Sequence, residues 1–170
     1  MNAHRTNRLL HRWASIAISL PLLIVILSGF LLLFKKESNW IQPPTRAGTT
    51  SQLSLSFDQI LAISKSVPEA KIKSWDDVNR LDVRPKKGMV KVRAKNRWEI
   101  QIDTQTGHIL QVAYRRSDLI ESLHDGSFFH PNARLWIFFP VAILLLILWL
   151  SGIYLFIIRT KKRKPTPKKS

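Results

Sequence analysis

The sequence predicts a membrane protein of the α+β class, in which two transmembrane helices flank a small domain made of a helix on an antiparallel sheet. Two long apolar stretches carry the first half of this prediction. Residues 14–34 contain no charge in 21 residues, and residues 135–158 contain none in 24. At about 1.5 Å per residue, each stretch can cross a hydrocarbon core about 30 Å thick. Alternating apolar residues between the two stretches carry the second half of the prediction.

The first stretch is expected to be an uncleaved signal anchor. It is longer than the apolar core of a cleaved signal peptide, which spans about 7–15 residues, and no small-x-small cleavage site follows it. Each predicted helix also contains a Ser-Gly step, in "LSGF" at 27–30 and in "LSGI" at 150–153. Such small residues allow another helix to approach closely.

The charge distribution predicts which parts lie on which side of the membrane. The chain has 27 Lys and Arg, 11 Asp and Glu, and a net charge of +16. Segments 1–13 and 159–170 together carry ten basic and no acidic residues, whereas 35–134 carries 17 basic and all 11 acidic ones. Short basic flanks stay in the cytoplasm. We therefore expect cytoplasmic termini, an extracytoplasmic domain at 35–134 and contact with membrane lipids, and no nucleic-acid partner.

The segment between the two helices has the pattern of a small α+β domain. Ser56 and Gln59 form a capping-box pattern that starts a helix. After Pro68 the pattern changes to alternation, with turns at 85–88, 95–96 and 104–107. We expect an antiparallel sheet of three or four strands. The strand-like segments contain Leu81 and Val83; Val90 and Val92; Trp98, Ile100 and Ile102; and Ile109 or Leu110 with Val112 and Tyr114. In the third strand, Arg97, Glu99 and Gln101 alternate with the apolar residues, which predicts one buried and one solvent-exposed face.

Several motifs resemble the PepSY-associated transmembrane family. Asp103, Thr106 and Gly107 match the Asp-x-x-Thr-Gly turn of the last PepSY hairpin. "LHRW" at the start of the first helix, "LHDG" before the second and "LSGIYLF" within it resemble the same family in the same order. The resemblance implies a location in the bacterial inner membrane. Relatives with four such helices resemble ferric-siderophore reductases, whose helices hold haem, whereas this chain has a single pair.

The residue inventory narrows the chemistry. Without cysteine, the chain has no disulfide, iron–sulfur cluster, thiol nucleophile or Cys-ligated zinc. It also has no Gly-rich dinucleotide loop, no Gly-x-Ser-x-Gly and no His-Glu-x-x-His. If the protein does redox chemistry, haem b held by histidine is the cofactor that its residues best support.

Three of the five histidines are candidate ligands of haem iron. His11 lies three residues before the first apolar stretch, and His124 and His130 lie 11 and 5 residues before the second. A short helix is predicted over 118–125, with an N-cap at Asp118, and it places His124 on one face with Ile120. The alternative for each histidine is an interfacial residue that binds water or backbone.

Two functions stay open at this level. His11 and His124 lie on opposite sides of about 30 Å of hydrocarbon, so they cannot share one haem within a chain. A twofold dimer would supply four helices and pair each histidine with its symmetry mate. Such a dimer would transfer electrons across the membrane for reductive iron use. The alternative is a non-enzymatic binding module that uses its sheet face to restrain a periplasmic peptidase or to dock on another membrane subunit, with incidental histidines.

Overall fold

The computed structural model describes residues 3–162, without the side chains of residues 3–8, 10 and 160–162. Most of the basic tail predicted at 159–170 therefore lies outside the described residues. The chain divides into two units, Met1–Gly29 with Ser122–Ser170, and Phe30–Glu121. The first unit contains the long apolar helices, and the second contains the sheet.

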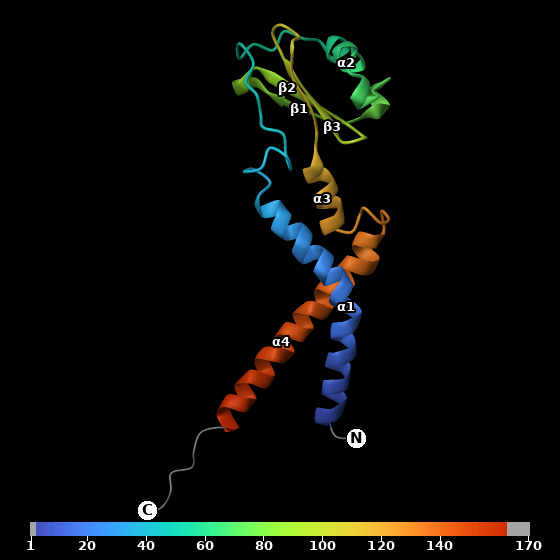
Figure 1. Ribbon diagram of the computed structural model, residues 1–170, viewed down its shortest axis with the longest axis vertical. Helices are drawn as coiled ribbons and strands as arrows, with labels where there is room; N and C mark the ends of the chain where they lie inside the picture. The colour runs from blue at the N-terminus through green and yellow to red at the C-terminus, as the bar shows by residue number, and fades with distance from the viewer. Residues whose placement is uncertain (1–2, 163–170) are drawn as a thin grey trace, which may run out of the picture. The chain divides into compact units, whose positions relative to one another are not determined.

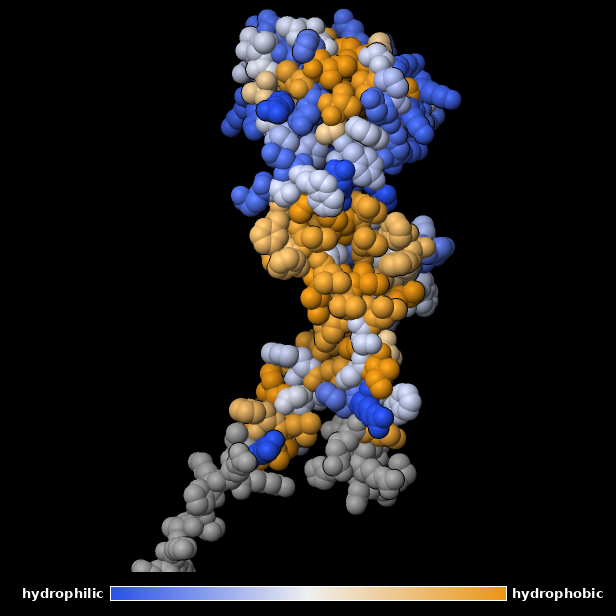
Figure 2. All heavy atoms as spheres, in the orientation of Figure 1, coloured by the Kyte–Doolittle hydropathy of each residue, from blue (hydrophilic) through white to orange (hydrophobic). Residues whose placement is uncertain are grey.

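Two helices are long and apolar enough to span a membrane. Helix α1 covers Ala3–Leu33 and contains a candidate span at His11–Leu33; α4 covers Phe139–Lys162, within a candidate span at Arg134–Arg159. The predicted spans 14–34 and 135–158 agree with these bounds to within a few residues, although α1 starts earlier than its apolar stretch. Figure 2 shows hydrophobic side chains over most of the visible face of both helices, with hydrophilic ones toward their lower ends.

A π-helical turn over Arg134–Phe138 precedes α4. In this turn the N–H of Phe139 donates to the carbonyl of Arg134, five residues earlier. Pro140, which follows directly, has no N–H, and its ring would clash with the carbonyl four residues before it. The wider turn gives this ring room at the start of α4.

The second unit is a helix on a four-stranded antiparallel sheet (Figure 1). Ser56 caps α2, and both hydrogen bonds of the predicted capping box with Gln59 are present. The strands lie in the order β1-β2-β3-β4. The elements are α2 at Phe57–Lys65, β1 at Val78–Arg84, β2 at Met89–Ala94, β3 at Trp98–Asp103, β4 at Ile109–Tyr114, and 3₁₀ turns at Pro68–Ala70, Trp75–Asp77 and Pro85–Lys87.

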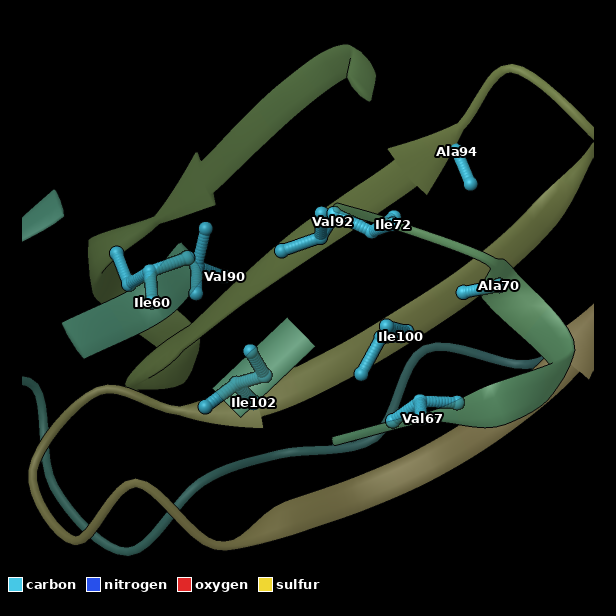
Figure 3. Close-up of a cluster of buried hydrophobic side chains, with 9 residues drawn as sticks. All are labelled: Ile60, Val67, Ala70, Ile72, Val90, Val92, Ala94, Ile100 and Ile102. Carbon is cyan, nitrogen blue, oxygen red and sulfur yellow. The ribbon is translucent and has the colours of Figure 1, made fainter. Parts of the chain in front are cut away.

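One face of the sheet forms the hydrophobic core. The register pairs Val90 with Ile102 and Val92 with Ile100, and all four side chains are fully buried. Ile60 of α2 packs on this face (Figure 3). The remaining members of the core are Val67, Ala70, Ile72 and Ala94. The predicted buried face of β3 is therefore confirmed.

The prediction that the other face of β3 is exposed to solvent was wrong. Glu99 and Gln101 are 1% and 0% exposed, and Lys91 on β2 is 1% exposed. The extended segment 44–49 covers this face. The side-chain amide of Gln101 donates a hydrogen bond to the carbonyl of Pro44 at 2.8 Å, and its Oε1 accepts one from the N–H of Arg46 at 2.8 Å. Alternation identified the two faces, but it does not distinguish a solvated polar face from a covered one.

Helix α3 covers Arg116–His124. The predicted N-cap at Asp118 was wrong, because the helix starts two residues earlier. Asp118 instead accepts a hydrogen bond from the Nε of Arg115 at 3.0 Å. Ile120 is buried, as predicted for its face of the helix.

Candidate functional site

His124, the last residue of α3, contacts α1 through its imidazole ring. Its Nδ1 lies 3.1 Å from the main-chain carbonyl oxygen of Val25 and 3.0 Å from Oγ of Ser28. The ring is partly buried. The contact joins residues that are almost a hundred positions apart in the sequence, and all of them belong to the first unit.

The hydrogen bonds assign the protonation state of Nδ1. A main-chain carbonyl only accepts, so Nδ1 must donate to Val25. The hydroxyl hydrogen of Ser28 points to the carbonyl of Ile24, with an oxygen–oxygen distance of 2.5 Å, so Oγ of Ser28 is also an acceptor for Nδ1–H. A neutral His124 therefore carries its hydrogen on Nδ1 and its lone pair on Nε2. Ligating histidines typically have this arrangement, in which one nitrogen donates to a carbonyl and the other binds the metal.

Gly29 permits the close approach of the ring. A Cβ atom at this position would lie 3.3 Å from Cε1 of His124 and 3.6 Å from its Nδ1. The first distance is shorter than ordinary van der Waals contact, so any larger side chain would displace the imidazole. The sequence predicted that the Ser-Gly step at 28–29 admits another helix, whereas in the structure the ring of His124 occupies the space at Gly29. At the second step, a Cβ on Gly152 would meet nothing within 4 Å in the described part of the chain.

The contact lies within the apolar span. Val25 and Gly29 precede Leu33, where α1 and its candidate span end, by eight and four residues. At about 1.5 Å per residue, the ring meets α1 about 6–12 Å before that end. A polar imidazole at this depth has both Nδ1 partners supplied by α1, which leaves Nε2 as its remaining polar atom.

The loop after His124 is held in place by a glycine and an aspartate. Gly126 has φ +80°, and a Cβ there would lie 2.2 Å from Cδ2 of Phe138. Asp125 accepts from the hydroxyl of Ser127 at 2.6 Å and lies 3.8 Å from Arg134. Burial raises the pKa of Asp125, but the hydrogen bonds from Ser127 and the charge of Arg134 outweigh burial and lower it. Asp125 therefore contacts Ser127 at one end of this loop and Arg134 at the other.

His130 has the opposite arrangement of its ring nitrogens. Its side chain is exposed, and its Nδ1 accepts a hydrogen bond from the N–H of Asn132 at 3.1 Å. The lone pair on Nδ1 is therefore in use, and a neutral His130 carries its hydrogen on Nε2. In this geometry neither nitrogen presents a lone pair to a metal.

His11 lies on α1 with an exposed side chain. It precedes Val25 by 14 residues, or about 21 Å along the helix. The structure therefore does not bring His11 and His124 of one chain together, in agreement with the expectation that they cannot share one iron.

A second polar cluster lies under the sheet of the other unit. Glu99 bonds Lys91 at 3.0 Å and Arg115 at 2.7 Å, and Arg115 bonds Asp118 at 3.0 Å. Burial lowers the pKa of Lys91, and the bond to Glu99 offsets only part of that effect. Each of these four charges has a partner of opposite sign, and Lys91, Glu99 and Arg115 are almost fully buried, which fits a role in stability. Segment 44–49 thus covers the polar face of the sheet at Gln101.

Comparison with known families agrees with this architecture. A family model described as the PepSY-associated TM region matches residues 8–170. The chain belongs to this PepSY-associated family. No curated protein and no solved structure matches the chain.

The histidines of this PepSY-associated protein do not form a metal cage within one chain. Among residues 3–162, no group of three or more His, Asp or Glu side chains is close enough to hold a metal ion. A metal bound by His124 would need further ligands, such as the four nitrogens of a porphyrin or a residue from a second chain. The residues that support His124 were missed by the sequence analysis, except for the small Ser28-Gly29 step.

Proposed function

We propose that two copies of this PepSY-associated protein hold haem b between their transmembrane helices and carry electrons across the bacterial inner membrane for reductive iron use. One observation carries the proposal: the Nδ1–H of His124 is bound by α1, so Nε2 is the nitrogen with the lone pair. Bound haem would supply one-electron transfer.

The residues of the chain have separate tasks in this proposal. His124 would hold a haem iron near the Leu33 end of α1, and His11 would hold a second haem iron near the other end. The carbonyl of Val25 fixes the ring of His124 and increases the basicity of Nε2. Ser28 supplies a second acceptor for the same hydrogen, and Gly29 leaves space for the ring.

A twofold dimer supplies the missing helices and ligands. One chain contributes two spans, of which 11% and 0% are buried. Most of their surface is therefore available to a second copy. In a symmetric dimer each histidine meets its own mate, so two chains provide two bis-histidine sites. The proposed orientation has cytoplasmic termini and an extracytoplasmic domain at 35–134, as the basic flanks favour.

Absorption spectroscopy of the full chain, purified in a mild detergent, tests the proposal. A Soret band and split α and β bands after reduction are expected, with about one haem per chain by the pyridine haemochrome assay. A folded, dimeric protein that stays colourless after expression with added haem precursor would refute it.

A second candidate function is docking to another protein outside the membrane. The observation that favours it is an exposed aromatic pair: Phe57 and Trp75 are 66% and 36% exposed, with ring centroids 6.2 Å apart in an edge-on arrangement. Large exposed apolar side chains that cluster often mark interaction surfaces. Reduced recovery of a membrane partner by a Phe57→Ser, Trp75→Ser variant that still binds haem normally would support docking as an additional function.

A further inference from the structure

A groove with a volume of about 300 Å³ lies between α1 and α4, which cross in Figure 1. Its walls are mainly aliphatic, with two hydroxyl groups near the end that faces the start of α1. The lining residues are Ser15, Ile18, Ser19, Leu22, Leu23, Ile26, Leu145 and Leu148. An open apolar groove in a membrane span is a site for hydrocarbon.

The α1 wall has a graded polarity along its length. Arg12 precedes Ser15 by three residues and Ser19 by seven, so the three lie on one face of the helix. Leu23 and Ile26 continue that face further along α1. At about 1.5 Å per residue, the hydroxyls lie about 5–10 Å past Arg12 and Ile26 about 21 Å past it. A cation, two hydroxyls and an aliphatic channel thus follow each other along one face.

We propose that this groove binds one anionic phospholipid. Its phosphate pairs with the guanidinium of Arg12, its ester region lies at the level of Ser15 and Ser19, and one acyl chain follows Leu23 and Ile26 against α4. Basic pockets between transmembrane helices bind anionic head groups in this way. Arg12 is exposed and no acidic residue lies in segment 1–34 of the sequence, so no neighbour along α1 competes with a phosphate for this cation. The site does not depend on the proposed haem function.

Native mass spectrometry of the full chain tests the site. The detergent-solubilised protein is mixed with dioleoyl phosphatidylglycerol or with dioleoyl phosphatidylcholine at the same concentration, and bound lipid is counted after mild activation. We expect one retained phosphatidylglycerol per chain. Arg12→Gln should weaken its binding about fivefold, which corresponds to about 1 kcal/mol for one basic residue near a lipid surface.

Two matched controls separate the groove from general effects. Arg159→Gln removes an arginine that lies at the end of α4, on the same proposed side of the membrane as Arg12. This change should leave lipid retention unchanged. Ser19→Leu fills the groove and should remove the retained lipid whatever its head group, whereas Ser151→Leu, the same change outside the lining, should not. All four variants should insert normally in a membrane fraction.

Three results would overturn the proposal. Equal retention of the two lipids would mean that no anionic head group is recognised. Equal effects of Arg12→Gln and Arg159→Gln would mean that lipid retention depends on the total basic charge and not on a site at Arg12. A Ser19→Leu variant that keeps its lipid but loses the dimer or haem would show that a second copy or the macrocycle occupies the groove.

Discussion

His124 and Val25 are joined by a hydrogen bond of 3.1 Å between Nδ1 and a main-chain carbonyl. The carbonyl cannot be removed by changing a side chain, so α1 presents a fixed acceptor to the ring. Removal of the hydroxyl of Ser28 still leaves this acceptor in place. The orientation of the ring therefore depends more on the backbone of α1 than on any single neighbouring side chain.

The buried pair Glu99–Lys91 and the exposed pair Glu121–Lys35 provide a matched test of the covered sheet face. Glu99→Ala would leave Lys91 and Arg115 buried without their shared carboxylate, and we expect a loss of about 3–5 kcal/mol in the free energy of unfolding. Glu121→Ala breaks an ion pair whose side chains are 47% and 30% exposed, and it should cost at most about 1 kcal/mol. Thermal unfolding of the full chain in detergent, followed by near-ultraviolet circular dichroism, measures both. Equally small losses of unfolding free energy in the two variants would mean that the sheet face with Glu99 is exposed to solvent.

Asp103 predicts how stability depends on acid. Burial favours a higher pKa, but hydrogen bonds from Gln105, Thr106 and Thr49 outweigh burial and lower the pKa to about 2. An unfolded aspartate has a pKa of about 3.9. The stabilisation is therefore complete above about pH 4 and is lost as the pH falls towards 2. Denaturant titrations between pH 6 and 2 should show this loss in the native protein, a smaller loss in Thr49→Val and the smallest in Asp103→Asn. Parallel curves for all three would contradict the assignment.

Gly126 and Gly152 should respond in opposite ways to the same substitution. An alanine at position 126 would combine a left-handed backbone with a clash against the rigid ring of Phe138, so we expect a cost of about 1–3 kcal/mol. An alanine at position 152, inside α4 with open space around it, should be neutral or slightly stabilising. The two thermal midpoints give the comparison. A tolerated Gly126→Ala would mean that the loop after α3 is not held by Phe138.

The orientation in the membrane is tested by two reporter fusions. A reporter that is active only outside the cytoplasm should work when fused after Tyr114, in the segment between the helices, and fail when fused after Lys169. The ten basic residues in segments 1–13 and 159–170 are the physical reason. The reverse pattern would place the sheet domain in the cytoplasm.

Features that depend on neighbouring residues were predictable from the sequence. The capping box of Ser56 and Gln59 was confirmed in both of its bonds, and the apolar alternation located all four strands. The two apolar stretches needed only their length and lack of charge. In each case the sequence pattern lies in the same segment as the structure that it predicts.

Features that depend on distant contacts were not predictable. Segment 44–49 has no periodicity, yet its backbone covers the polar face of the sheet and keeps Glu99 from solvent. Asp118 has the residue type of a helix cap, and its ion pair with Arg115 could not be predicted because the sequence does not show that Arg115 is buried. The bonds of His124 to Val25 and Ser28 link positions 99 and 96 residues away, and no local pattern encodes such a contact.

Haem content per chain in single histidine variants is the most direct test of the central claim that His124 is an axial ligand. His124→Ala should retain about half of the haem of the native protein, with the site of His11 still filled, and His11→Ala should do the converse. The double variant should be colourless but still inserted, and His130→Ala should match the native protein, because its Nδ1 is bound to Asn132. If His124→Ala keeps all of its haem with an unchanged spectrum, His124 is not a ligand and the central claim is contradicted.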